Sequence, residues 1–269
     1  MKKLVFLLCL ASFFLPPLFT EDIRVVINSG HTGPVRTLEA DERENLLFSA
    51  GDDGTVRAWD TDTRKLVSLL QISHNPILKI VLHPTKPHVA AVQKNGINSF
   101  LLTVWNWKRK TELYSRELDE LPLHIDYSPK GTYLVYSKTS WDSLIFLRGE
   151  TGRKLPFLSN GFGIVSHFAI SPSENTILSY SPSGKINYHN IGEGDRKYFF
   201  QTLPDLEKIE FTTNLRFMAA SDTNRFLLID LTNGNVIAET EIKNLATISA
   251  NSLTGDFMCL YPSDNSFQV

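Results

Sequence analysis

The sequence is poor in the residues and motifs that usually mark an enzyme or a disulfide-rich protein. It has only two cysteines, Cys9 and Cys259, so disulfides are excluded as its main source of stability. None of its seven histidines stands in an HxxxH pair or beside a cysteine cluster, so we expect no metal site. It also lacks a Gly-x-Ser-x-Gly motif and a phosphate-binding loop. We therefore predict a protein without a cofactor and without catalytic activity.

An excess of charge of either sign is also absent. The chain has 27 Lys and Arg against 29 Asp and Glu, a formal net charge of -2, and no basic or acidic tail. Proteins that bind nucleic acid concentrate positive charge on one face, so a nucleic-acid partner is not expected.

Long apolar runs are confined to the first twenty residues, MKKLVFLLCLASFFLPPLFT. Two lysines, an apolar run from Leu4 to Leu15 and a Pro-Pro pair follow the layout of a signal peptide, and the run is short for a bilayer span. We predict a signal peptide over residues 1–20 and an exported chain, periplasmic or extracellular, without a membrane span. An uncleaved anchor and lipidation at Cys9 are the alternatives.

The rest of the chain carries a repeat. Six segments each combine a short alternating strand, a polar turn and a second apolar strand. The segments are VRTLEADERENLLFSA from Val35, LKIVLHPTKPHVAAVQ from Leu78, LHIDYSPKGTYLVYSK from Leu123, SHFAISPSENTILSYS from Ser166, EKIEFTTNLRFMAASD from Glu207 and ATISANSLTGDFMCLY from Ala246. Their equivalent positions, 42, 45, 43, 41 and 39 residues apart, are Leu38, Ile80, Ile125, Phe168, Ile209 and Ile248.

This period, with four short strands per unit, is typical of a β-propeller. The segments are rich in Val, Ile, Tyr and Phe and are broken by Pro and Gly, which argues against helical repeats. We therefore predict an all-β fold over residues 21–269, a β-propeller with about six four-stranded antiparallel blades. The sixth unit stops inside its third strand. Either a strand at residues 22–28 completes that blade and covers its open edge, or the chain is a fragment of a protein with more blades.

The stretch GDDGTVRAWD from Gly51 ends the third strand of the first unit in a Trp-Asp pair. With its Trp59 and Asp53, and with Ser49 and His31 nearby, the unit resembles a WD-repeat. The resemblance implies a hydrogen-bonded chain from the Trp59 indole through Ser49 and His31 to Asp53. Such a chain stabilises one blade and does not process a substrate.

Only the first unit carries the full pattern. The second keeps His74 and Trp105, the fifth ends its third strand in Asp230, and the third and fourth have Phe146 and Tyr188 near the Trp position. The repeats YSPKGTYLVYS and ISPSENTILSY are also similar to those of Tol-system and prolyl-peptidase propellers. The GDDG turn fits neither a sialidase-type Asp-box nor the spacing of a calcium loop.

Residues in the loops of one propeller face are candidates for binding a partner. Trp141 lies in the predicted turn between the second and third strands of the third blade, and Phe162 lies in the loop that enters the fourth. Aromatic residues on an exposed rim are effective anchors for a partner, although each could instead pack over a neighbouring blade. Turns of the same kind hold Asp52, Lys94, Asn224 and Arg225.

The leading hypothesis is a non-catalytic scaffold that binds a protein or peptide of the cell envelope through this face. A second hypothesis makes the chain the sensor or scaffold portion of a larger protein whose catalytic domain lies beyond Val269. A third, a propeller hydrolase or lyase, needs converging histidines and carboxylates in the central channel. His124 and His167 occupy corresponding repeat positions, but most channel positions are expected to be apolar or small.

Overall fold

The structure is a computed structural model, and it describes residues 30–140, 144–155, 162–191, 196–212, 214–222, 224–242, 247–250, 257–261 and 266–268. The chain divides into two units, Met1–Gly30 and His31–Val269. All strands described below belong to the second unit. The predicted signal peptide, the strand expected at residues 22–28 and the candidate anchor Trp141 lie outside the described residues.

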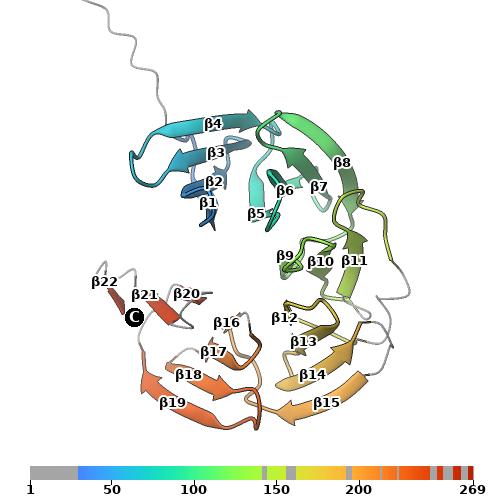
Figure 1. Cartoon of the computed structure of the whole chain (residues 1–269), viewed down its shortest axis with the longest axis vertical. Helices are drawn as coiled ribbons and strands as arrows, with labels where there is room; N and C mark the ends of the chain where they lie inside the picture. Colours follow the sequence, from blue (N-terminus) through green and yellow to red (C-terminus); the bar gives the residue numbers. More distant parts are fainter. Residues whose placement is uncertain are drawn as a thin grey trace, which may run out of the picture. The chain divides into compact units, whose positions relative to one another are not determined.

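The regular elements of the described residues are all β-strands, which confirms the predicted all-β class. They form six sheets in which consecutive strands pair antiparallel, as the hairpin turns of the repeat predict (Figure 1). The sheets contain, in chain order, β1 (Val35–Asp41), β2 (Leu46–Gly51), β3 (Thr55–Asp60) and β4 (Leu66–Gln71); β5 (Ile77–Leu82), β6 (His88–Lys94), β7 (Phe100–Asn106) and β8 (Thr111–Leu118); β9 (Ile125–Tyr127), β10 (Tyr133–Ser137) and β11 (Leu144–Arg148); β12 (His167–Ile170), β13 (Thr176–Tyr180), β14 (Lys185–Asn190) and β15 (Arg196–Gln201); β16 (Lys208–Phe211), β17 (Phe217–Ser221), β18 (Arg225–Asp230) and β19 (Val236–Glu241); and β20 (Thr247–Ala250), β21 (Phe257–Tyr261) and β22 (Ser266–Gln268).

The third and sixth sheets have three strands each. Beside β11, an isolated bridge joins Leu147 to Lys154, where the sequence predicts the fourth strand of the third blade. The predicted fourth strand, KLPFLS from Lys154, continues into residues 156–159, which lie outside the described part of the chain.

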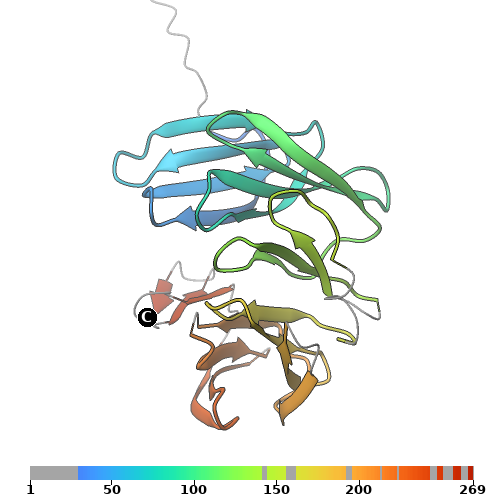
Figure 2. The same cartoon turned by 45° about the vertical axis from the view of Figure 1, so that its right-hand side comes forward.

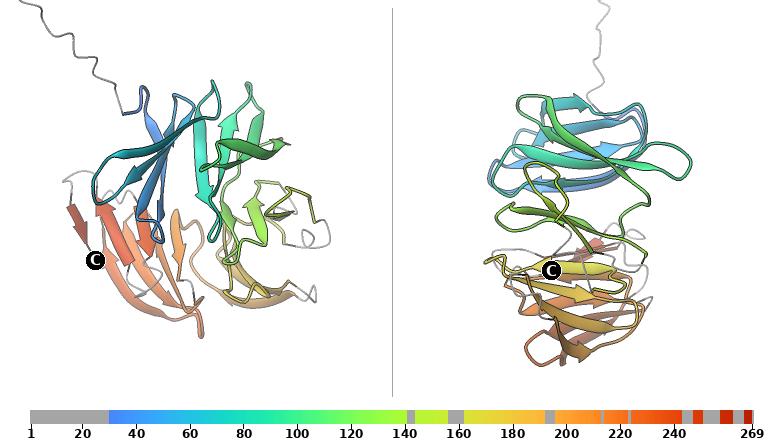
Figure 3. Two further views of the ribbon diagram at one scale, coloured as in Figure 1. Left: turned by 45° about the horizontal axis from the view of Figure 1, so that its top comes forward. Right: turned by 90° about the vertical axis from the view of Figure 1, so that its right-hand side faces the viewer.

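Apolar layers hold successive sheets together. Phe48 and Ile80 lie in the layer between the first and second sheets, and comparable clusters join each later pair. Figures 2 and 3 show the twisted sheets of this unit following one another in chain order. Leu38 is the exception among the six equivalent positions, with 57% of its area exposed, because it lies on the face of the first sheet opposite the second.

Two places in this arrangement gather residues from several sheets. The first strand of each sheet lies innermost in Figure 1, and β1 contacts β5 just as β16 contacts β20. We call the space between these first strands the central channel. The turns after β2, β6, β13 and β17 meet the connectors that join neighbouring sheets, for example through a 2.8 Å bond from the Thr202 amide to the Gly184 carbonyl. We call this end of the sheets the turn face.

Candidate functional site

The four residues of the WD-like pattern form one hydrogen-bonded chain in the first sheet. The Trp59 indole donates to the Ser49 hydroxyl over 2.8 Å, and Ser49 donates to His31 Nε2 over 2.7 Å. His31 Nδ1 in turn donates to Asp53 over 2.9 Å. The order of partners is the one implied by the resemblance, and it leaves no member free to act on a substrate.

Asp53 is the most heavily bonded group of this chain. It also accepts hydrogen bonds from the Thr55 hydroxyl at 2.8 Å and from the amides of Thr32 and Thr55, each at 3.1 Å. Arg57, only 4% exposed, pairs with it at 3.3 Å. Burial alone would raise the pKa of Asp53, but the hydrogen bonds from His31, Thr55 and Thr32 hold that pKa well below its usual range. Asp53 is therefore a charged structural anchor.

Strand register locates the Trp position in the other blades. Trp59 is the last residue but one of β3, and its equivalents in β7, β11, β14 and β18 are Trp105, Leu147, His189 and Ile229. The residues expected near that position, Phe146 and Tyr188, are each one residue earlier and project from the opposite side of their strands.

The residue at the register position of Ser49 differs between the sheets. By the same register, Ala91 in β6 takes the place of Ser49, and the buried Trp105 Nε1 has no hydrogen-bond partner among the described residues. In the fourth sheet, Ser179 takes that place and its hydroxyl lies 3.3 Å from His189 Nε2. A serine at this register therefore accompanies a polar ring in the first and fourth sheets, but not in the second.

The four described turn residues predicted to bind a partner are on the turn face, but they differ in exposure and in ion pairing. Asp52 is engaged with Arg36 at 2.7 Å. Arg225 is paired with Asp222 and Glu239 at 2.7 and 3.0 Å, and its binding role, like that of Asp52, stays a prediction. Lys94 and Asn224 are exposed, and no ion pair of Lys94 occurs among the described residues.

Phe162 is not the exposed rim residue that the sequence suggested. Only 7% of its area is exposed, and its ring centroid lies 4.1 Å from that of His189 and 6.0 Å from that of Phe146. The connector turns this apolar side chain into the core between the third and fourth sheets. Phe162 instead packs over a neighbouring blade, the alternative that its loop position also allows.

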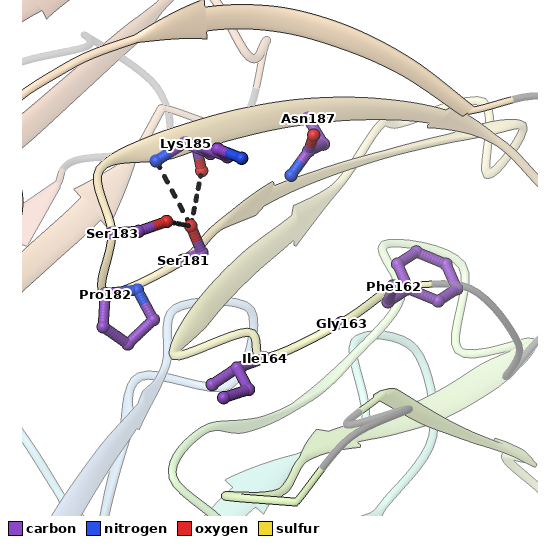
Figure 4. A pocket seen from close by; sticks show the side chains of 8 residues that line it. All are labelled: Phe162, Gly163, Ile164, Ser181, Pro182, Ser183, Lys185 and Asn187. Carbon is purple, nitrogen blue, oxygen red and sulfur yellow. Dashed lines mark hydrogen bonds between the residues drawn. The ribbon is translucent and has the colours of Figure 1, made fainter.

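A cavity of about 430 Å³ opens on the turn face beside Phe162. The connector residues Phe162, Gly163 and Ile164 lie along one side, and the β13–β14 turn with the start of β14 forms the other (Figure 4). The turn is braced by Ser181, whose hydroxyl accepts from the Lys185 amide at 3.2 Å and lies 2.9 Å from the Ser183 hydroxyl. The remaining lining residues are Pro182 and Asn187. Sequence reasoning selected Phe162 and this face but missed the β14 residues of the cavity.

The central channel contradicts the expectation of mostly apolar or small side chains. The residue after each repeat position is acidic in three of the first strands, namely Glu39, Asp126 and Glu210. The residue before it is basic or imidazole in four, namely Lys79, His124, His167 and Lys208. Strand alternation makes both sets point the same way, so the channel has an acidic layer next to a basic one.

Burial and like charges shift the pKa values of the acidic layer upward. Burial raises the pKa of Glu39 to about 8, aided by the charges of Asp126 and Glu210. Burial and the charge of Asp126 raise the pKa of Glu210 to about 7. Asp126 keeps contact with solvent, yet the surrounding protein displaces enough water to raise its pKa to about 7.

The pKa values of the histidines in the basic layer are shifted downward. Burial, with the charges of His167 and Lys79, lowers the pKa of His124 to about 3. Burial and the charges of Lys79 and Lys208 lower that of His167 to about 4. The cavity beside them holds about 80 Å³, room for a few water molecules but not for an organic substrate.

Two features are absent from the described residues. No group of three or more His, Cys, Asp or Glu residues there has an arrangement that could hold a metal ion. No described helix is long and apolar enough to cross a membrane.

Six antiparallel sheets packed in chain order, with a Trp-Ser-His-Asp chain in the first, define a β-propeller of WD-repeat type. The family model described as TP_0598_N, N-terminal beta-propeller domain, matches residues 20–257. The chain belongs to this family.

Individual relatives are distant. An uncharacterized protein of Treponema pallidum (strain Nichols) is 26% identical over 145 residues, which are 54% of this chain and 23% of that protein. Pre-mRNA-processing factor 17 of Saccharomyces cerevisiae is 24% identical over 60% of this chain and 37% of its own length. The LST8 homolog of Drosophila melanogaster is 26% identical over 56% of this chain and 50% of its own. The matched part of the chain thus spans half or less of each relative.

Proposed function

We propose that this propeller is a non-catalytic scaffold that binds a peptide segment of a partner protein through its turn face. The cavity beside Phe162 and β14 carries this proposal. It is concave and lined by Phe162, Ile164 and Pro182, and its volume of about 430 Å³ suits a peptide side chain with its backbone. Ile164 is 39% exposed at its edge, an apolar residue that a bound peptide would cover.

Catalysis in the central channel is the weaker alternative, although its histidines and carboxylates do converge. The adjoining cavity of about 80 Å³ is too small for an organic substrate. In the first sheet, the one serine near a histidine and an aspartate is already the acceptor of the Trp59 indole. The arrangement supports a packed and partly hydrated channel more than a site of chemistry.

The proposal also places the protein outside the cytoplasm. The support is the signal-peptide layout of residues 1–20, with Lys2, Lys3 and the apolar run that follows them. Expression of the full chain in a bacterium should yield a shortened mature protein in the periplasmic fraction. A full-length product in the cytoplasmic fraction would contradict export.

A second reading, that the propeller is the sensor or scaffold portion of a larger protein, draws support from the relatives. The family description calls the domain N-terminal, and the matched region covers only 23% of the Treponema protein. In that reading the turn face recognises a peptide signal for a domain encoded beyond Val269.

The test is a selection of short displayed peptides on the full chain, followed by affinity measurements. Ile164→Arg places a charge at the edge of the cavity and should weaken selected peptides at least about tenfold. Arg109→Glu, in the exposed β7–β8 turn at the other end of its sheet, is the control and should have no effect. Trp141→Ala tests the remaining predicted anchor. Peptides that bind equally well to the Ile164→Arg protein would contradict the proposed face.

A further inference from the structure

The cavity on the turn face has a polar side and an apolar side. Lys185 and Asn187 both line it, and they stand two residues apart on β14, so alternation puts them on the same face of the strand. Phe162, Ile164 and Pro182 supply the apolar surface, and Figure 4 shows the connector across the cavity from β14. A ligand that fills the cavity must therefore be amphipathic over a short distance.

Asn187 is the most informative of these residues. It is 3% exposed, and its side-chain amide makes no hydrogen bond among the described residues. Buried amides in folded proteins are nearly always hydrogen-bonded, because desolvation without a partner is costly. Because Asn187 lines the open cavity, its amide can offer one donor and one acceptor to a ligand bound there.

Lys185 adds a charge to the same side. Like Lys94, and unlike Lys86, Lys108 and Lys138, Lys185 has no carboxylate within ion-pair distance of its ammonium group in the described part of the chain. Its polar neighbours in the cavity, Ser181, Ser183 and Asn187, are neutral. The charge of Lys185 is therefore available to an anionic ligand group.

We propose that the cavity binds the carboxyl-terminal residue of a peptide that ends in an apolar side chain. Such a residue presents an apolar side chain, a backbone N–H and a carboxylate within one residue. The side chain packs on Phe162, Ile164 and Pro182; the N–H donates to the Asn187 carbonyl oxygen; and the carboxylate accepts from Asn187 and Lys185. This inference rests on the proposed peptide-binding function and specifies its ligand.

The experiment uses the full chain and a library of short peptides displayed with free carboxyl termini. Selected sequences should converge on an apolar last residue. The tightest peptide is then synthesised as the free acid and as the terminal amide, and both are titrated by fluorescence anisotropy. The acid should bind at least about tenfold more tightly than the amide, because the amide cannot form the ion pair.

Two variants locate the effect. Lys185→Gln should weaken the acid about tenfold and leave the amide unchanged, since only the acid interacts with the charge. Asn187→Leu, which keeps the branched shape of the side chain and removes the polar group, should weaken both forms. Lys110→Gln, at an exposed lysine of the β7–β8 turn, is the matched control and should change neither.

The outcomes separate this inference from the proposed function. Equal affinities of acid and amide, with both still lost in the Ile164→Arg protein, would overturn the terminal-residue inference while peptide binding at this face stands. An acidic residue selected inside the peptide, with no preference at its end, would overturn it in the same way. If no selected peptide is sensitive to Ile164→Arg, both are wrong. Because Lys185 is exposed, its variant keeps the test valid even if Asn187→Leu does not fold.

Discussion

At the scale of single residues, Asp53 has the largest structural role in the first blade. It holds a histidine, a threonine, two backbone amides and the buried Arg57 around one carboxylate. The same bonds that hold the pKa of Asp53 well below its usual range stabilise the folded state, because the unfolded chain cannot form them.

Removal of this carboxylate should therefore lower the stability of the folded protein. Asp53→Ala leaves Arg57 and His31 without their partner, and we expect the free energy of unfolding to fall by about 3 kcal/mol, measured by urea denaturation near neutral pH. Asp62→Ala, at an exposed aspartate of the β3–β4 turn, should change it by less than about 0.5 kcal/mol. A loss below about 1 kcal/mol for Asp53→Ala would show that the network adds little.

The residue pattern was sufficient to predict this network but not the state of Phe162. The resemblance to a WD-repeat, carried by His31, Ser49, Asp53 and Trp59, implies partners that the structure places in contact. Phe162 stands in a loop whose path depends on the core of two sheets, with Phe146 from one and His189 from the other. Such long-range packing cannot be inferred from local sequence, so the residue was wrongly expected at the surface.

At the scale of the strands, the repeat predicted the hairpins well because alternation and polar turns are local signals. The exact ends of the third strands were less predictable. A shift of one residue exchanges the two faces of a strand, and for this reason Phe146 and Tyr188 were expected near a position that Leu147 and His189 occupy.

Register also yields a stabilising substitution in the second sheet. Ala91 stands where Ser49 accepts the Trp59 indole, and the Trp105 N–H lacks an acceptor among the described residues. Ala91→Ser should supply the acceptor and raise the free energy of unfolding by about 1 kcal/mol, measured by urea denaturation.

The neighbouring alanine provides the control. Ala90 is equally buried but faces the layer between the second and third sheets, away from the indole. Ala90→Ser should destabilise by about 1–2 kcal/mol, because its hydroxyl is buried without a partner. Equal effects of the two substitutions would mean that the hydroxyl introduced by Ala91→Ser does not reach the indole of Trp105.

At the scale of the whole propeller, the channel charges show what the sequence concealed. The repeat aligned Ile125, Phe168 and Ile209 as core positions, and five of the six aligned positions are buried. The charged residues next to these positions can be grouped only when the structure shows that the first strands face one centre. The acidic and basic layers are therefore a property of the assembled fold rather than of any one repeat.

The acidic layer predicts a pH dependence of stability. The pKa values of Glu39, Asp126 and Glu210 are raised to about 8, 7 and 7, so the folded state retains protons that the unfolded state has lost. Their contribution is fully present below the unfolded carboxyl pKa values and is lost as the pH rises through about 7 to 8. The free energy of unfolding should therefore fall as the pH rises from about 6.5 to about 8 and level off above that.

A variant isolates this contribution. Glu39→Gln, Asp126→Asn and Glu210→Gln together should remove the fall between about pH 6.5 and about pH 8, measured by urea denaturation across the range. His124 and His167 titrate in the unfolded chain near 6.5 and act in the opposite direction at the lower end of this range, but both remain in the variant. Lys79 and Lys208 remain in both proteins, so the difference between the two curves reports the carboxyls. Parallel curves would contradict the raised pKa values.

The central claim is that a peptide binds at the turn face while the channel and the Trp59 network serve the fold. Hydrogen exchange of the full chain, with and without the tightest peptide from the selection, tests it most directly. We expect slowed exchange at the amides of Phe162–Ile164 and Ser181–Asn187, with the channel strands β9 and β16 unchanged. Protection confined to β9, β12 and β16, or to the turns at the opposite end of the sheets, would contradict it.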